Sequence, residues 1–460
     1  MSDRTRVGLG ILGAAAALGV LGDLLLRETP WGLNWALWAA ALILLGLALG
    51  ARRRFALGLA LLFSAALAWR ASPALAALNV LASAGALALA AIPIVRVGVV
   101  GHLLATLRLG GDAAAGPVQV AIDDVDWKEV PSGGVRAQVP SIARGLLVAM
   151  PLVLVFGGLF IAADEVFGDL VGNAFDIGDP ATHIAVFLLW AWIASGVIRH
   201  LVAERGSIDA KTPHTYGSTE VAIALGSLVA LFLAFVIVQL RYLFGGNDRV
   251  LETAGLTYAE YARRGFLELV LVAALTLPVL LVGDAVAKSR RLFRGLALAL
   301  VVLLGVVMAS ALQRMLLYTD AYGLTRLRLY ATAFMVALAL TFAWLVVTVL
   351  RERRTNFALG AIAIAFVTVA GLNVLNPDAL IARVNIDRHV AGKPLDSIYL
   401  AQLSTDATPT ILSRLDRVPA NEAEFLRRAL EPNDGGWRTW SWSRARARDA
   451  YDKSVRAANR

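Results

Sequence analysis

The stretch Leu292–Gln313 reads LFRGLALALVVLLGVVMASALQ, and from Gly295 onward it carries no charged residue. A run of this length matches the roughly 20 apolar residues that an α-helix needs to cross the hydrocarbon core of a bilayer. No water is present there to bond the backbone, so such a segment is stable only as a helix or in a closed barrel. The stretch therefore predicts a transmembrane helix.

Similar stretches follow one another along most of the chain. Of 460 residues, 58% are hydrophobic and 17% are charged, whereas soluble domains carry about 25% charged residues. We expect an all-α protein, a polytopic transmembrane helix bundle of about 11 spans with a small C-terminal helical soluble domain. The expected spans are Val7–Leu26, Trp31–Gly50, Phe55–Trp69, Pro73–Val95, Gly145–Ala163, His183–Ile198, Glu220–Leu240, Gly265–Val282, Leu292–Gln313, Leu329–Leu350 and Phe357–Leu375. The third and sixth are short, so about ten to twelve spans fit the sequence.

Charge and composition exclude several classes of protein. The net charge is +9, but the basic residues stand in short runs between apolar stretches, as membrane-topology signals do. No nucleic-acid partner is therefore expected. The chain has no cysteine, which excludes disulfides, thiol catalysis and cysteine-bound metals. Its five histidines show no metal-ligand spacing, so we expect no metal and no other cofactor.

The basic runs also indicate an orientation. Cytosolic loops are enriched in Lys and Arg, and the runs Arg52–Arg54, Lys288–Arg294 and Arg351–Arg354 mark alternate loops as cytosolic. The N-terminus is then in the cytosol and the C-terminus outside. Val7–Leu26 is longer than the core of a signal peptide and is expected to remain as a span. The Arg- and Ala-rich composition is typical of bacteria, which suggests a multi-pass protein of the bacterial cytoplasmic (inner) membrane.

Four regions are expected: N-terminal transmembrane helices 1–4 in residues 1–109, a cytosolic loop in 110–140, transmembrane helices 5–11 in 141–375, and an extracytoplasmic helical tail in 376–460. The loop contains Gly110, Gly111, Pro117 and an acidic group at Asp123–Asp126. We interpret it as a solvated linker, with a docking loop or a divalent-cation site as the alternatives.

Three tryptophans lie close together in the tail, and they have two interpretations. Trp437, Trp440 and Trp442 are expected to pack the tail helices or to lie at the level of the lipid headgroups, where tryptophan is favoured. The alternative is that they line a ligand site.

Several polar segments within this apolar chain carry a family resemblance. They are Arg144–Leu147, Ala162–Phe167, Arg241–Gly246, Gly255–Phe266, Ala321–Thr325, Leu375–Asp378 and Asp396–Leu400. Together they resemble the uncharacterised bacterial membrane proteins grouped as domain of unknown function 4153/4173. The resemblance covers roughly Arg144 to Trp442, and the first four helices match only in general character. It implies a multi-pass architecture and no activity, so no catalytic residue can be carried over.

Glu268 is the acidic residue that is predicted to lie deepest in a span. It follows the polar block Thr257–Arg264 and lies about one helical turn inside the apolar run, where an unpaired charge costs about 2–3 kcal/mol or more. Thr257 and Glu260 form a capping box. Glu260, Arg264 and Glu268 share one helix face, so Arg264 can pair with either acid.

The ends of the neighbouring spans supply further polar residues on the same predicted face of the membrane. We interpret them as an outward-facing polar pocket whose arginines suit a phosphate or carboxylate. The alternative is a structural ion-pair network that fastens the helix ends. The candidate pocket comprises Glu268, Arg264, Glu260, Tyr261, Gln239, Arg241, Tyr242, Gln313, Arg314, Asp320, Tyr322, Arg326 and Arg328. No residue is assigned a catalytic or metal-binding role.

The leading functional hypothesis is a non-enzymatic envelope protein. It would be embedded in the lipid bilayer as its first partner. Through this pocket it would bind, transport or help assemble an anionic lipid or another envelope protein. The first alternative is a membrane-embedded sensor or scaffold with an extracytoplasmic domain. The second is an integral membrane enzyme acting on a lipid-linked substrate, with Glu268, Glu260 or Asp320 as its acid or base.

The predicted orientation can be measured cleanly because the chain has no native cysteine. We expect Ser397→Cys to react with a membrane-impermeant maleimide in intact cells, and Ser132→Cys to react only after lysis. The reverse labelling pattern would place the tail and the candidate pocket in the cytosol.

Overall fold

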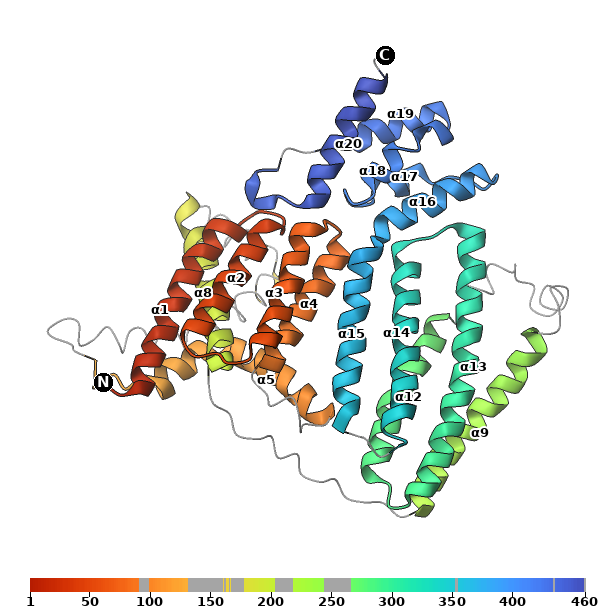
Figure 1. Cartoon of the computed structure of the whole chain (residues 1–460), viewed down its shortest axis with the longest axis horizontal. Helices are drawn as coiled ribbons and strands as arrows, with labels where there is room; N and C mark the ends of the chain where they lie inside the picture. Colours follow the sequence, from red (N-terminus) through yellow and green to blue (C-terminus); the bar gives the residue numbers. More distant parts are fainter. Residues whose placement is uncertain are drawn as a thin grey trace. The chain divides into compact units, whose positions relative to one another are not determined.

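The computed structural model consists of helices (Figure 1). It describes residues 1–90, 99–130, 160, 163–164, 166, 178–202, 218–243, 266–351, 355–432 and 435–458. Within these ranges there are sixteen α-helices and no strand, which confirms the all-α prediction. The chain divides into two compact units, each described here by itself. Unit 1 comprises residues 1–94, 100–208 and 432–446, and unit 2 comprises 95–99, 209–431 and 447–460.

Eight of the described helices are long and apolar enough to cross a membrane: α1 (Asp3–Leu26), α4 (Pro73–Ala90), α8 (Gly178–Val202), α9 (Ser218–Leu243), α12 (Phe266–Val286), α13 (Arg290–Tyr322), α14 (Arg326–Thr348) and α15 (Thr355–Leu375). Two shorter apolar helices, α2 (Leu33–Ala48) and α3 (Arg54–Trp69), accompany them. Only 17% of the apolar window of α15 is buried within the protein, and an apolar helix surface of this kind is suited to the hydrocarbon of a bilayer. The chain is therefore a multi-span membrane protein.

Ten of the expected spans thus correspond to described helices, and the fifth, Gly145–Ala163, falls almost wholly outside the described residues. The sixth expected span is part of α8, which has 25 residues and is therefore long enough to cross a bilayer. The second and third remain short, at 16 residues each.

Unit 1 is organised around the contact between α1 and α8, which are far apart in the sequence. Gly19 and Gly22 of α1 lie against Phe187 and Trp190 of α8 so closely that a Cβ at either glycine would overlap them. Small residues let membrane helices approach closely and gain van der Waals contact. Asp23 near the end of α1 meets His183 near the start of α8, with Oδ2 and Nδ1 2.5 Å apart. The two helices are therefore antiparallel.

Residues 110–119, expected to lie in a loop, belong instead to α5 (Val99–Gln119), and a π-helical turn, η1 (Val120–Asp124), follows. The helix continues through Pro117 because tertiary contact with α8 outweighs local propensity. Gly116 meets Gly196 so tightly that a Cβ on either residue would overlap the partner helix. Next to this crossing, Asp112 Oδ2 lies 2.6 Å from Nδ1 of the buried His200.

The three tail tryptophans are all partly exposed. The short helix η4 (Trp437–Thr439) lies on the loop between α1 and α2, where the amide of Leu33 donates to the Trp440 carbonyl (2.9 Å) and Arg438 Nη1 donates to the Leu24 carbonyl (2.9 Å). The backbone of this segment fixes it in unit 1 and leaves the indole rings of Trp437 and Trp440 exposed.

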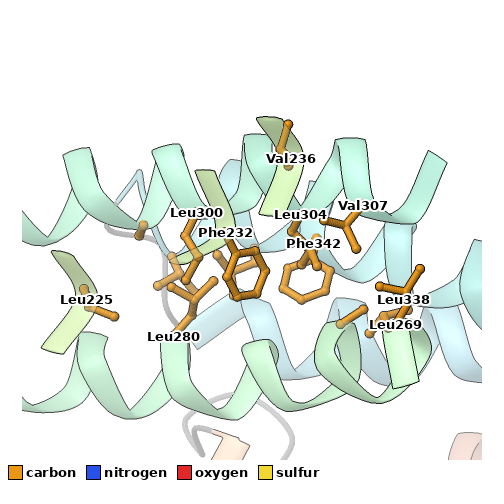
Figure 2. Close-up of a cluster of buried hydrophobic side chains, with 14 of the residues drawn as sticks. Leu225, Phe232, Val236, Leu269, Leu280, Leu300, Leu304, Val307, Leu338 and Phe342 are labelled. Atoms are coloured by element: carbon orange, nitrogen blue, oxygen red, sulfur yellow. The ribbon is translucent and has the colours of Figure 1, made fainter. Parts of the chain in front are cut away.

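In unit 2, α13 is the central helix and packs against α9, α12 and α14. Figure 2 shows side chains from all four helices directed toward one another, among them Phe232, Leu280, Leu304 and Phe342. These residues are at least nine-tenths buried, so they form the hydrophobic core of the unit. The next helix, α15, packs on α14.

The described residues of the tail, 376–432 and 435–458, form several helices joined by short connections, as expected. The helix α16 (Pro377–Val390) turns away from the end of α15 (Figure 1). After it come α17 (Ser397–Ala401), α18 (Thr408–Leu412), η3 (Leu415–Arg417) and α19 (Ala420–Ala429), all in unit 2. The last helix, α20 (Trp442–Ala458), begins in unit 1 and ends in unit 2.

The glycine crossing between α5 and α8 predicts a specific sensitivity. Gly116→Ala should destabilise the protein by about 1–3 kcal/mol, because the added methyl group overpacks the contact. Gly110→Ala on the same helix is the matched control, since a Cβ there meets open space and replacing glycine lowers the entropy of the unfolded chain. Thermal unfolding in detergent should show a lower midpoint for the first variant only. Equal midpoints would mean that the crossing is not tightly packed.

Candidate functional site

Eight residues of the candidate pocket have described side chains, and all of them lie in unit 2 near one end of its spans. This end is where α13 and α14 are joined by the three residues Gly323–Thr325, which we call the α13–α14 turn. Arg241 and Tyr242 lie in the last turn of α9, but their side chains are outside the described part. Glu260, Tyr261 and Arg264 lie outside the described residues altogether.

Gln239 and Arg314 are brought together inside the span, together with Ser310, which the sequence did not suggest. Gln239 is 6% exposed, and its Oε1 accepts hydrogen bonds from Arg314 Nη2 and from Ser310 Oγ, both at 3.0 Å. Arg314 lies about two helical turns, roughly 12 Å, before Tyr322 at the end of α13. Gln239 therefore holds the guanidinium of Arg314 in place, and Ser310 helps to orient the Gln239 side chain.

Arg326, at the start of α14, pairs with Asp378 of α16. Its Nε donates to Oδ1 (3.0 Å) and its Nη2 donates to Oδ2 (2.7 Å), a bidentate ion pair. The amide of Ser404 donates to the same Oδ2 (2.9 Å). The Asp378 side chain is 0% exposed. We call this group the Arg326–Asp378 clamp, because it attaches the first tail helix to the start of α14.

The clamp also holds the segment that follows α16. Arg326 Nη2 donates to the carbonyl of Gln402 (3.2 Å), and the Arg326 amide donates to the hydroxyl of Tyr399 (2.8 Å). At the junction of α15 and α16, Asn376 adopts a left-handed conformation with φ of 55° and caps α16 through the amide of Ala379. These contacts fix both the direction of α16 and the position of α17.

The α13–α14 turn is docked on α16 through its backbone. The side chain of Asn385 makes two hydrogen bonds to the backbone of Leu324. Its Oδ1 accepts from the Leu324 amide, and its Nδ2 donates to the Leu324 carbonyl, both at 2.8 Å. Gly323 has a φ of +85°, and a Cβ there would lie 2.7 Å from Asn385 Oδ1 and 2.8 Å from Arg388 Nη1. Only glycine fits this position without strain.

Arg328, two residues beyond the clamp, has a different environment. Its guanidinium carbon lies 3.8 Å from the centroid of the Tyr318 ring, a cation–π contact between α14 and α13. Its Nη1 donates to the carbonyl of Gly323. In the described part of the chain these two partners of the Arg328 side chain are both uncharged, so they hold the guanidinium in place without neutralising it.

The other members of the predicted pocket are solvent- or lipid-accessible. Glu268, Gln313 and Tyr322 are exposed on α12 and α13. Asp320 is also exposed, and its Oδ2 lies 3.9 Å from Lys393 Nζ. Each of the other pocket residues whose side chain is described is either exposed or bonded to a residue other than Glu268. The structure therefore places the pocket residues at one end of the unit in separate groups.

Electrostatics distinguish the clamp from an exposed ion pair. Burial by itself would raise the pKa of Asp378, but the hydrogen bonds from Arg326 and Ser404 outweigh it and hold the pKa of this carboxyl below its usual value. Burial raises the pKa of Tyr399 despite the neighbouring arginine. Asp378 is therefore ionised, and Tyr399 neutral, at any pH near 7.

Sequence reasoning about the pocket missed Asp378, Tyr399 and Asn385. Two of them had a signal, because Asp378 and Tyr399 belong to segments that carry the family resemblance. The structure brings three of those segments together at the clamp: Ala321–Thr325, Leu375–Asp378 and Asp396–Leu400. Among the described residues, no group of three His, Asp or Glu side chains could hold a metal ion.

A comparison with protein families identifies the family of the chain. The family model described as domain of unknown function (DUF4153) matches residues 56–413. The chain belongs to this family. The match begins in α3, well before the Arg144 that the motifs suggested, and it ends in the tail after α18. No curated protein and no solved structure matches the chain.

The clamp predicts a large effect of a small substitution. Asp378→Asn keeps the shape but removes the charge, which leaves Arg326 partly buried without its counter-ion. It should cost about 3 kcal/mol, seen as a lower unfolding midpoint and faster proteolysis of the tail. The control is Asp387→Asn on the same helix, whose exposed pairs with Arg414 and Arg417 contribute about 0–1 kcal/mol.

This effect should depend on pH with a definite sign. The pKa of Asp378 is lowered in the folded protein, so its contribution is fully present above the unfolded value of about 3.9 and is lost as the pH falls through the folded value. The stability difference between the natural protein and Asp378→Asn should be constant from neutral to mildly acidic pH. A difference that already vanishes near pH 6 would contradict the ion pair.

Proposed function

We propose that this protein binds an anionic amphiphile, an anionic lipid or a related envelope component, at the α13–α14 end of unit 2. This end faces the outside of a bacterial cytoplasmic membrane. Binding is the common step of the transport and assembly roles that the sequence suggests, and it requires no chemistry at the site.

The observation that carries the proposal is the contrast between two arginines in the first turn of α14. Arg326 is neutralised by the carboxylate of Asp378, whereas Arg328 is held by an aromatic face and a carbonyl group. A guanidinium so placed near the end of a span lies at the level of lipid phosphates and keeps donors for them. Arg314 of the same helix hairpin, whose guanidinium donates to Gln239, places a second arginine in the outer half of the span.

The packing of unit 1 supports the proposed topology of eleven spans. The helices α1 and α8 are antiparallel, so an even number of crossings must separate them. Three apolar helices, α2, α3 and α4, lie between them in the described residues. A further crossing between α4 and α8 would make the number even, and the apolar stretch Gly145–Ala163 is the expected one. Eleven spans with a cytosolic N-terminus then put the C-terminus and the α13–α14 turn outside.

One observation favours a second candidate, a scaffold or sensor. The clamp and Asn385 fasten the tail helices to the spans at fixed geometry, as a domain that presents a docking surface would require. The enzyme alternative has less support. Of its suggested acids, Glu260 lies outside the described residues, and Glu268 and Asp320 are exposed on different helices.

Anion recognition can be tested with purified protein in detergent. We expect native mass spectrometry to show tighter binding of dioleoyl phosphatidylglycerol than of dioleoyl phosphatidylcholine. Arg328→Gln should reduce this preference about tenfold, because a hydrogen bond to a charged group contributes about 1.5–3 kcal/mol. The matched control is Arg291→Gln, which removes one exposed charge from the opposite end of α13.

Two results would reject the proposal. One is equal binding of the two lipids by the natural protein. The other is an equal loss of preference in both arginine variants, which would mean that only the net charge matters. Competition by inorganic phosphate at comparable concentration would identify a free anion, rather than a lipid, as the ligand.

A further inference from the structure

The face of unit 2 between α13 and α14 carries an apolar groove with a cavity volume of about 400 Å³. Its floor includes Leu304 and Phe342, which are almost completely buried. Its open side is formed by small residues, Gly305 and Ala309 on α13 and Ala339 and Ala343 on α14. A Cβ built on Gly305 meets nothing within 4 Å, so the side-chain space at this position is empty.

The position of the groove limits what can occupy it. All of its lining residues are apolar and lie in the middle of two candidate spans, at the depth of the lipid hydrocarbon. A peptide or a hydrated solute would leave its polar groups without hydrogen-bond partners there. A hydrocarbon chain has no polar group to satisfy, and it gains dispersion contact with both helices.

The groove points toward Arg328. On α14, Arg328, Thr332, Val336, Ala339 and Ala343 follow one another at intervals of three or four residues, so they share one helix face. The side chain of Arg328 leans across to Tyr318 of α13 and therefore lies over the space between the two helices. From Arg328 to Val336 is eight residues, roughly 12 Å along the axis. One end of the groove thus leads to a fixed positive charge.

We propose that the groove holds an acyl chain of an anionic phospholipid whose phosphate binds Arg328. This inference rests on the proposed function, which concerns the anionic headgroup, and adds a binding site for the acyl chain. The headgroup supplies charge recognition at the end of α14, and the chain supplies length-dependent affinity from the groove. The ligand is a membrane lipid, bound from the leaflet that the α13–α14 turn faces.

The test separates the chain from the headgroup. Gly305→Leu fills the groove, and Gly295→Leu is the control on the same helix, where a Cβ also meets open space. Each protein is titrated with dioleoyl and with dihexanoyl phosphatidylglycerol and measured by native mass spectrometry. The natural protein and Gly295→Leu should bind the long-chain lipid at least about tenfold more tightly. Gly305→Leu should lose most of this difference and keep its preference for phosphatidylglycerol over phosphatidylcholine.

The possible failures are distinguishable. If the natural protein prefers the anionic headgroup but Gly305→Leu keeps the full dependence on chain length, the groove is not the chain site and the proposed function stands. If the natural protein shows no headgroup preference, the proposed function fails, whatever the chain length does.

A second measurement does not depend on the folding of a variant. A phosphatidylglycerol with a photoreactive diazirine in its acyl chain should label residues 301–312 and 335–343 of the natural protein. Unlabelled lipid should compete for this labelling. Labelling spread evenly over the other spans would overturn the inference.

Discussion

A carboxylate that is withdrawn from water determines the arrangement of one end of this protein. Removing an ion from water costs several kcal/mol, and the cost is recovered only when its hydrogen-bonding capacity is met. Asp378 meets this condition with two donors from Arg326 and one from the Ser404 amide. These donors come from the start of α14 and from the loop after α17. All of these segments must therefore be in place for the carboxylate to be stable, which couples the tail to the spans.

The same end shows how position in a helix decides the role of a charge. Arg326 and Arg328 are two residues apart, so they point to different sides of α14. Arg326 contacts the tail, where its charge is neutralised by Asp378. The other meets α13, where a tyrosine ring and a carbonyl orient it. The two faces of α13 also differ. One face carries Arg314, which bonds Gln239 of α9, and the other carries the small residues that line the groove beside α14.

The sequence predicted the spans well because apolar runs are local signals. It did not predict α5, because Gly110, Gly111 and Pro117 are loop formers by themselves and the helix is held by distant contacts to α8. The candidate pocket was assembled by proximity to the ends of spans. That criterion grouped Gln239 and Arg314 in one pocket without predicting their hydrogen bond. It also could not reveal that Arg326 pairs with a residue 52 positions away. Periodicity indicates which face a residue occupies and not which distant helix covers it.

The contact between α1 and α8 has a consequence for how the protein is made. The glycines of α1 pack against Phe187 and Trp190 of α8. The ribosome adds these residues only after about 165 further residues, a delay on the order of 10 s at usual elongation rates. During that time the surface of α1 that packs against α8 has no α8 to contact, so it must have another neighbour. Completion of unit 1 is therefore a post-insertion event, in which a late helix displaces whatever occupied the surface of an early one.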